Sequence, residues 1–281
     1  HELLKLLLNY RRQSHCVRSK LKYNMSFASK VAIVTGASSG IGAYLSTAFA
    51  KEGAKVILVA RNEERLLKVA KECEAFGPKP LIVKADITSD EEGKNVIKKT
   101  IDKFGKLDVL VNSAGILRTG LLEKGDIMEV FDEVMKINVR AAVNLLKFAT
   151  PHLIKSKGNV VNISSVGGQQ VFAEFMASYS TSKAAIDMFS RAAAIELGKH
   201  GVRINVVSPG AVLETGLLTN AGFDPKLTAD DVGFRSLLGR WSDRQEIADL
   251  VLFLASERAK GVTGSIYTCD NGYLNVKHCY K

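Results

Sequence analysis

The chain has 281 residues, of which 46% are hydrophobic and 24% are charged, and its formal net charge is +10. This length and composition suit a folded globular protein and argue against intrinsic disorder. No apolar run approaches the ~18 residues that a membrane-spanning helix needs, so the sequence predicts a soluble protein without a membrane span.

The excess positive charge is concentrated at the N-terminus. Residues 1–24 hold six Lys and Arg against one acid, a net charge of +5 and half of the total. In the rest of the chain basic and acidic residues are interspersed, as on solvated helix faces. No basic stripe with interleaved aromatic residues is present, so we expect no nucleic-acid partner.

Residues 1–24 allow two interpretations. Met25 is followed by SFASKVAIVTG, a short lead-in to a first strand, which would make residues 1–24 upstream sequence of a cytoplasmic protein. Their Arg-rich, nearly acid-free composition would also suit a mitochondrial targeting peptide. In both cases we expect one catalytic domain over residues 25–281, because no linker or internal repeat interrupts it.

Cysteine and histidine give no sign of a metal-binding or cross-linked protein. The four cysteines form no CxxC motif and no disulfide framework, which favours reducing surroundings. The five histidines are scattered along the chain. We therefore expect no metal site.

Short β-branched segments alternate with helical patterns along the body. The predicted strands are 31–35, 55–60, 80–85, 107–112, 158–164, 202–208 and 265–269, and the predicted helices are 41–53, 62–76, 90–104, 127–149, 176–199 and 243–256. Continuous apolar strands separated by helices indicate a parallel sheet covered on both faces. We therefore predict an α/β doubly wound (Rossmann) fold of about seven strands. The irregular segment 211–240 has the composition of a substrate-covering loop.

A glycine-rich turn, TGASSGIG at 35–42, joins the first predicted strand to the first helix. Glycine permits the tight turn and lets a pyrophosphate approach the backbone. The helix N-terminus then supplies free N–H groups and the positive end of its dipole. The motif predicts dinucleotide binding by Gly36, Ser38, Ser39, Gly40, Ile41 and Gly42.

The end of the second strand, VILVARNEE, bears on the choice of dinucleotide. NAD-binding folds usually place an acid about 20 residues after the glycines, where it binds the ribose 2′-hydroxyl. Arg61 stands there instead, and a guanidinium attracts a 2′-phosphate, so NADP is favoured and NAD stays possible. Alternatively, Arg61 begins a solvated turn. Asp86 and Ile87 follow the third strand and could meet the adenine, although Asp86 could equally cap a helix.

The stretch YSTSK at 179–183 places a phenol and an ammonium four positions apart. On a helix these two side chains share one face. A nearby cation favours the phenolate and lowers the pKa of a tyrosine from about 10, so the pair could donate or accept a proton near neutral pH. Alone, the pattern would also fit an exposed Tyr beside a solvated Lys.

Several motifs together resemble the short-chain dehydrogenase/reductase family. TGASSGIG, NSAG (112–115), Asn138 in MKINVRAA, NISSVGG (162–168), YSTSK and VVSPG (206–210) occur in the order of that family and near its spacings. The resemblance covers nearly the whole body of the chain. It is to the single-domain form with the cofactor site first, and to 3-oxoacyl-carrier-protein-reductase-like members.

The resemblance implies roles for four residues. Tyr179 would give its proton to a carbonyl oxygen, Lys183 would hold the nicotinamide ribose and keep the pKa of Tyr179 low, and Ser165 would stabilise charge on the substrate oxygen. Asn138 would position a water in a proton relay. The further cofactor contacts that it implies are Asn112, Ala114, Gly115, Pro209, Gly210, Val212 and Thr215.

The chain departs from the family pattern at three places. Ser165 precedes Tyr179 by 14 positions, one more than usual. Position 214, where the family usually has a cofactor-binding Thr, is Glu, and Thr215 comes one residue later. The late strand ends in CDNGY rather than with Asp-Gly-Gly, and we expect its Asn to adopt the left-handed backbone that Gly often supplies.

These observations predict an NADP-preferring oxidoreductase that transfers a hydride between a nicotinamide and a carbonyl or secondary alcohol. A catalytically silent nucleotide sensor or scaffold is the alternative from another class. The family resemblance further implies a homo-oligomer, commonly a tetramer. An apolar pocket wall is suggested, with core packing as the competing role, by Leu217, Leu218, Phe223, Phe234, Leu237 and Leu238.

Overall fold

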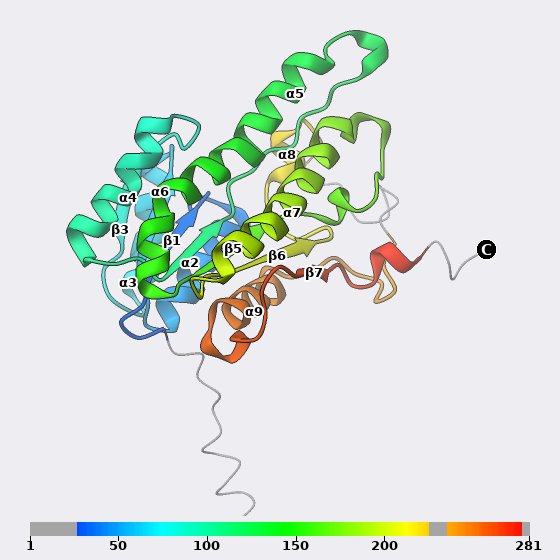
Figure 1. Ribbon diagram of the computed structural model, residues 1–281. Helices are drawn as coiled ribbons and strands as arrows, with labels where there is room; N and C mark the ends of the chain where they lie inside the picture. The colour runs from blue at the N-terminus through cyan, green and yellow to red at the C-terminus, as the bar shows by residue number, and fades with distance from the viewer. Residues whose placement is uncertain (1–26, 225–234, 277–281) are drawn as a thin grey trace, which may run out of the picture.

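The computed structural model of the chain describes residues 27–224 and 235–276. Its centre is a parallel sheet of seven strands in the order β3-β2-β1-β4-β5-β6-β7 (Figure 1). The strands are β1 (Val31–Thr35), β2 (Lys55–Ala60), β3 (Leu81–Lys84), β4 (Val109–Asn112), β5 (Asn159–Ile163), β6 (Arg203–Pro209) and β7 (Ile266–Cys269). The predicted doubly wound fold is confirmed, with the strand order reversing between β1 and β4.

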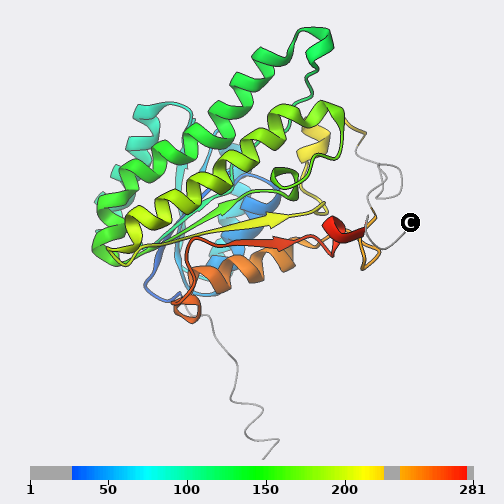
Figure 2. The ribbon, with the colours of Figure 1, turned by 45° about the vertical axis from the view of Figure 1, so that its right-hand side comes forward.

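Each face of the sheet is covered by helices. The covering helices are α2 (Gly40–Lys51), α3 (Glu63–Glu74) and α9 (Arg244–Ala255) on one face, and α4 (Asp90–Phe104), α6 (Ala141–Ser156) and α7 (Ala177–Gly198) on the other (Figure 2). Within β1, Val31 and Ile33 join the apolar core beneath α4, α6 and α7, whereas Ala32 and Val34 join the core beneath α2, α3 and α9. Burial on both sides explains why the strands are continuously apolar.

One long rod forms from three helical segments, α5 (Ile127–Met135), a π-helical turn at Lys136–Arg140, and α6. The sequence predicted a helix that stopped at residue 149, two residues before Pro151. In the structure α6 continues through Pro151 to Ser156. The last turns are held because Leu153 is fully buried in the core, which outweighs the missing backbone N–H of the proline.

Short elements complete the described chain. They are α8 (Leu217–Asn220) and the 3₁₀ turns η1 (Leu122–Lys124), η3 (Val166–Gly168), η4 (Glu174–Met176), η5 (Glu257–Ala259) and η6 (Tyr273–Asn275). Both the basic segment 1–24 and part of the predicted substrate loop, residues 225–234, lie outside the described residues. Of the helices in the described ranges, none is long and apolar enough to cross a membrane.

Candidate active site

A cavity of about 940 Å³ lies at the carboxyl ends of the strands, where the strand order reverses. In doubly wound folds this crevice is the usual ligand site. Of the residues predicted at the site, those that line the cavity are Gly36, Ser38, Ser39, Gly40, Ile41, Gly42, Arg61, Asp86, Ile87, Ala114, Gly115, Ser165, Tyr179, Lys183, Pro209, Gly210, Val212 and Thr215. Two predicted residues, Asn112 and Asn138, lie beneath the lining instead.

The glycine turn is packed too closely for side chains. Gly36 has φ +67°, and a Cβ on it would lie 2.9 Å from the Ala114 Cα, while a Cβ on Gly42 would lie 2.4 Å from the Gly36 carbonyl oxygen. The Thr35 hydroxyl accepts hydrogen bonds from the backbone N–H groups of Ser113 and Ala114 at 3.1 and 3.2 Å. The turn therefore presents bare backbone and the N-terminus of α2 to the cavity, which fits the pyrophosphate of a dinucleotide.

Charged side chains mark the end of the cavity beyond β2. Arg61 and Arg65 both line it and both are exposed. Sequence reasoning missed Arg65, although it lies one helical turn from Arg61. Asp86 accepts hydrogen bonds from the Thr88 N–H at 3.0 Å and the Thr88 hydroxyl at 2.9 Å. The N-cap of α4 is Ser89, so the helix-cap role considered for Asp86 is wrong.

Tyr179 and Lys183 lie on one buried face of α7, as the i, i+4 spacing predicts. Tyr179 is 4% exposed and Lys183 is 5% exposed. The Lys183 Nζ donates a hydrogen bond to the Ile163 carbonyl at 3.0 Å and lies 5.6 Å from the centroid of the Tyr179 ring. Ser165 follows β5, and its side chain is hydrogen-bonded to Tyr179. The reading of YSTSK as an exposed pair is wrong.

Burial sets the protonation of this pair. Burial raises the pKa of Tyr179 to about 12, although the hydrogen bond with Ser165 lowers it in part. Burial also lowers the pKa of Lys183 to about 8, opposed by the negative charge of Asp187 one turn further along α7. The lowered pKa that the sequence predicts for Tyr179 is therefore wrong, because burial of the phenol raises this pKa. The phenol is protonated at neutral pH and can serve as a proton donor.

Asn138 sits inside the π-helical turn and ties three segments together. Its side-chain oxygen accepts a hydrogen bond from the Ile116 N–H at 2.8 Å, and its Nδ2 donates to the Ile116 carbonyl at 2.9 Å and the Ser182 hydroxyl at 3.0 Å. A Cβ on Gly115 would lie 3.3 Å from the Asn138 oxygen and 3.4 Å from the Lys183 Nζ. Asn138 and Lys183 therefore both lie close to Gly115.

The predicted Asn112 contact is placed differently from the other cofactor residues. Asn112 ends β4, and its Nδ2 donates to the Asn162 Oδ1 at 2.8 Å, while Asn162 donates to the Ser190 hydroxyl at 2.8 Å. Its side chain therefore joins strands β4 and β5 to α7. The neighbouring Ala114 and Gly115 line the cavity in its stead.

Glu214 and Thr215, which follow β6 and depart from the family pattern, make different contacts. Glu214 has φ +54° and forms an ion pair with Arg244, the first residue of α9. Thr215 lines the cavity, and a Cβ on Gly40 would lie 2.9 Å from its carbonyl oxygen. Thr215 thus lies against the glycine turn, one residue after the left-handed Glu214.

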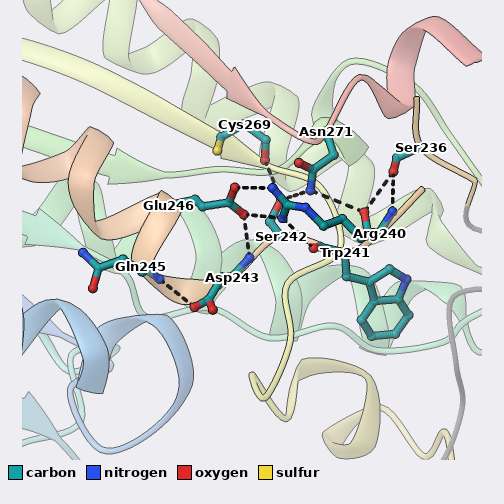
Figure 3. A network of polar contacts seen from close by, with 9 residues as sticks. All are labelled: Ser236, Arg240, Trp241, Ser242, Asp243, Gln245, Glu246, Cys269 and Asn271. Carbon is teal, nitrogen blue, oxygen red and sulfur yellow. Dashed lines mark hydrogen bonds and ion pairs between the residues drawn. The ribbon is translucent and has the colours of Figure 1, made fainter. Parts of the chain in front are cut away.

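A polar network fixes the chain between residues 236 and 246 (Figure 3). The Arg240 guanidinium donates to both carboxylate oxygens of Glu246, at 2.9 and 2.7 Å, and to the Trp241 carbonyl at 3.2 Å. Asn271 donates to the Ser242 hydroxyl at 3.0 Å and has φ +54°, which confirms that it adopts the left-handed conformation predicted for CDNGY. The network joins the segment before α9 to the turn after β7.

The substrate side of the cavity is more aromatic than the sequence predicted. Of the six apolar residues proposed there, Leu217, Leu218 and Phe223 line the cavity, whereas Leu237 and Leu238 lie outside it and Phe234 is beyond the described residues. Four aromatic lining residues were missed, namely Phe172, Phe175, Trp241 and Tyr273. The only available signal was the FAEF stretch just before YSTSK.

Comparisons with known proteins agree with this geometry. Residues 36–274 match the family model described as Enoyl-(Acyl carrier protein) reductase. The chain is 34% identical to the 3-oxoacyl-[acyl-carrier-protein] reductase FabG of Thermotoga maritima, over 89% of this chain and all of the relative. It is 37% identical to the 2,5-dichloro-2,5-cyclohexadiene-1,4-diol dehydrogenase LinX of Sphingobium indicum, over 88% of this chain and 96% of the relative.

Solved structures show the same similarity. One is the short-chain dehydrogenase/reductase of unknown function from Caenorhabditis elegans, solved with cofactor. It superposes with a TM-score of 0.81 at 32% identity, covering 88% of this chain and 96% of that one.

The close approach at Gly42 predicts that Gly42→Ala destabilises the chain. The new Cβ would collide with the Gly36 carbonyl, which is backbone and cannot rotate away. We expect the free energy of unfolding to fall by about 1–3 kcal/mol and dinucleotide affinity to fall with it. Chemical denaturation and a dinucleotide titration would measure the two effects.

The matched control is Gly198→Ala, because a Cβ there would meet nothing within 4 Å. Gly198 is the last residue of α7, so we expect this change to be neutral or to stabilise the chain by up to about 1 kcal/mol. Equal stability and affinity in the two variants would contradict the packing described for the glycine turn.

The Arg240–Glu246 pair predicts an acid-sensitive contribution to stability. The hydrogen bond from Arg240 lowers the pKa of Glu246 to about 2, below its ordinary value of 4.5. The pair therefore stabilises the fold fully above pH 4.5 and loses that effect as the pH falls toward 2. We expect Glu246→Gln to cost about 1 kcal/mol at pH 7, since the pair is partly exposed, and less below pH 4.

Denaturant unfolding between pH 3 and 7 would test this prediction, with Glu196→Gln, an exposed carboxylate of α7, as the control. A cost for Glu246→Gln that is the same at both ends of the range would show that the charge of Glu246 contributes nothing.

Proposed function

The chain belongs to the short-chain dehydrogenase/reductase family of nicotinamide-dependent oxidoreductases, and on this premise we propose an NADP-preferring enzyme with Tyr179 as its general acid and base. Its substrate is a carbonyl compound or a secondary alcohol. The observation that carries the proposal is a single cavity with the glycine turn and two arginines at one end and Tyr179, Lys183 and Ser165 at the other.

The bound nicotinamide supplies the hydride, and the chain supplies orientation and the proton. In reduction, the protonated phenol of Tyr179 donates its proton to the substrate oxygen. Ser165, already hydrogen-bonded to Tyr179, binds the same oxygen and stabilises the negative charge that develops on it. In oxidation the phenolate takes the proton back.

Lys183 carries positive charge beside the phenol, and it would hold the ribose hydroxyls of a bound dinucleotide. A pKa of about 8 leaves it mostly protonated at neutral pH, where its charge favours proton release from Tyr179. Asn138 completes the relay. Its Nδ2 is engaged by Ile116 and Ser182, whereas its Oδ1 accepts one hydrogen bond, from the Ile116 N–H, and can accept a second from a relay water.

Two guanidinium groups favour NADP. Arg61 and Arg65 line the cavity end where the ribose 2′ position is expected, and Arg61 takes the place of the acid typical of NAD enzymes. A planar guanidinium binds phosphate through paired hydrogen bonds. The relative from Thermotoga maritima, a reductase by name, is consistent with use in the reductive direction.

Exposed apolar residues on the outer helices support assembly into a homo-oligomer, which we propose to be a tetramer working in the cytoplasm. Met188 and Ile195 on α7 are 61% and 83% exposed, and Met128 on α5 is 61% exposed. Met188 and Ile195 are seven positions apart on α7 and so share one face of the helix, which could bind another protein chain.

The proton role of Tyr179 predicts that Tyr179→Phe abolishes most turnover. We expect kcat with any reducible ketone to fall by about 10²–10⁴-fold, the usual contribution of general acid catalysis, with NADPH affinity retained. The decrease in NADPH absorbance would measure turnover. Tyr44→Phe, which removes a hydroxyl bonded to Gln245 outside the cavity, is the control.

Turnover that survives unchanged in Tyr179→Phe would refute the proposed proton donor. Saturable NADPH binding by the wild-type chain without turnover of any ketone or alcohol would instead support the sensor or scaffold alternative.

The arginine pair predicts cofactor selectivity. We expect Arg61→Ala to raise KM for NADPH about tenfold, because a charge-assisted hydrogen bond to phosphate is lost, and to leave KM for NADH unchanged. Steady-state kinetics with both cofactors would measure the change. Arg258→Ala, at an exposed arginine in η5, should alter neither value, and an equal change for the two cofactors in Arg61→Ala would refute the assignment.

A further inference from the structure

Aromatic side chains from four separate segments gather on the substrate side of the cavity. They form what we call the aromatic wall, defined by Phe172, Phe175, Phe223, Trp241 and Tyr273. Phe172 lies two residues before η4 and Phe175 lies within it, just before the helix that carries Tyr179. Phe223 follows α8, Trp241 precedes α9, and Tyr273 begins η6. The wall therefore adjoins the proton donor.

Ring contacts hold two pairs of the wall in place. Phe172 meets Tyr273 edge to face, with centroids 4.8 Å apart, and Phe175 meets Phe223 with centroids 5.3 Å apart. Both distances lie in the range at which aromatic rings attract each other. Each pair joins segments far apart in sequence, so the ring contacts link these segments to one another at the cavity.

Trp241 is fixed by the polar network around Arg240. Arg240 binds the Trp241 carbonyl and the Glu246 carboxylate together, and the neighbouring Ser242 hydroxyl accepts a hydrogen bond from Asn271. Figure 3 shows the indole ring pointing away from this network. The backbone on both sides of Trp241 is thus anchored, while its ring lines the cavity.

The positive charge of Arg118, on the substrate side of the cavity, is paired with a carboxylate of the chain. Arg118 lines the cavity there, but its Nε and Nη2 donate to Glu133 at 3.2 and 3.4 Å, and its Nη1 donates to the Leu117 and Asn220 carbonyls. All three guanidinium nitrogens are engaged within the chain. Among the described residues that line the cavity, the one carboxylate is Asp86, at the adenine end. Arg118, the charged side chain that the described residues place on this side of the cavity, is therefore already paired with an acid.

We propose that the substrate is an uncharged ketone, or the matching alcohol, with an aromatic or fused-ring body that packs against the aromatic wall. This inference rests on the proposed oxidoreductase function and narrows its substrate class. A flat ring system gains edge and face contacts with fixed aromatic side chains. A sugar or a keto acid would set its hydroxyl or carboxylate groups against the apolar rings of the wall, and removing these groups from water costs free energy.

The chain's one tryptophan supplies a direct test. We expect 2-tetralone to change the fluorescence emission of Trp241 saturably, in both the wild type and Tyr179→Phe, and we expect butanone and pyruvate to leave it unchanged. A parallel titration of N-acetyltryptophanamide corrects for light absorbed by the ketone. In NADPH-coupled assays, kcat/KM for 2-tetralone should exceed that for butanone and for pyruvate by at least about tenfold, the discrimination typical of an apolar pocket.

Ring removal tests the wall itself. Phe175→Leu and Tyr273→Leu should each lower kcat/KM for 2-tetralone about two- to tenfold through KM, the size of a ring–ring contact. Phe76→Leu, at an exposed ring of the surface, should change nothing. The inference about the substrate would be wrong if butanone or pyruvate were turned over as efficiently as 2-tetralone, or if the ring variants matched the wild type. Either result would leave the proposed oxidoreductase function intact. Saturable tetralone binding without turnover of any ketone or alcohol would support the wall and refute the proposed function.

Discussion

Burial of a phenol and an ammonium in one turn of α7 is the constraint on which the rest of the site depends. Burial favours the neutral form of each group, and so it raises the pKa of Tyr179 and lowers that of Lys183. The small residues of YSTSK allow this burial. Ser182 bonds to both the Tyr179 carbonyl and Asn138, and a Cβ on Gly168 would lie 2.8 Å from the Lys183 carbonyl carbon. Larger side chains at these positions would push the helix away from β5 and expose the pair to water.

Features that depend on nearby residues could be predicted from the sequence. The alternation of strands and helices follows from the two-sided burial of each strand, and the glycine turn follows from backbone geometry within eight residues. The shared face of Tyr179 and Lys183 is also local, since it needs only a helix. These three predictions place the glycine turn and the Tyr179–Lys183 pair at the cavity.

Features of the site and the fold that depend on tertiary packing could not be predicted from the sequence. The balance of effects on the Tyr179 pKa requires knowledge of how deeply the phenol is buried, which the i, i+4 spacing does not contain. The aromatic wall brings together residues as distant as Phe172 and Tyr273, and nothing local links them. Helix α6 passes Pro151 because the core holds Leu153, a contact that the local proline rule ignores.

The π-helical turn at Lys136–Arg140 contains, in effect, one residue more than a regular helix would need. Each residue of a helix turns the chain by about 100°, so deleting one residue there would restore ideal geometry and rotate everything on one side of it. The apolar stripe of α6 and the amide of Asn138 could then no longer both face inward. The π-helical turn therefore sets the rotation of the two halves of the rod about its axis independently. The apolar stripe of α6 can then face the core while Asn138 faces the active site.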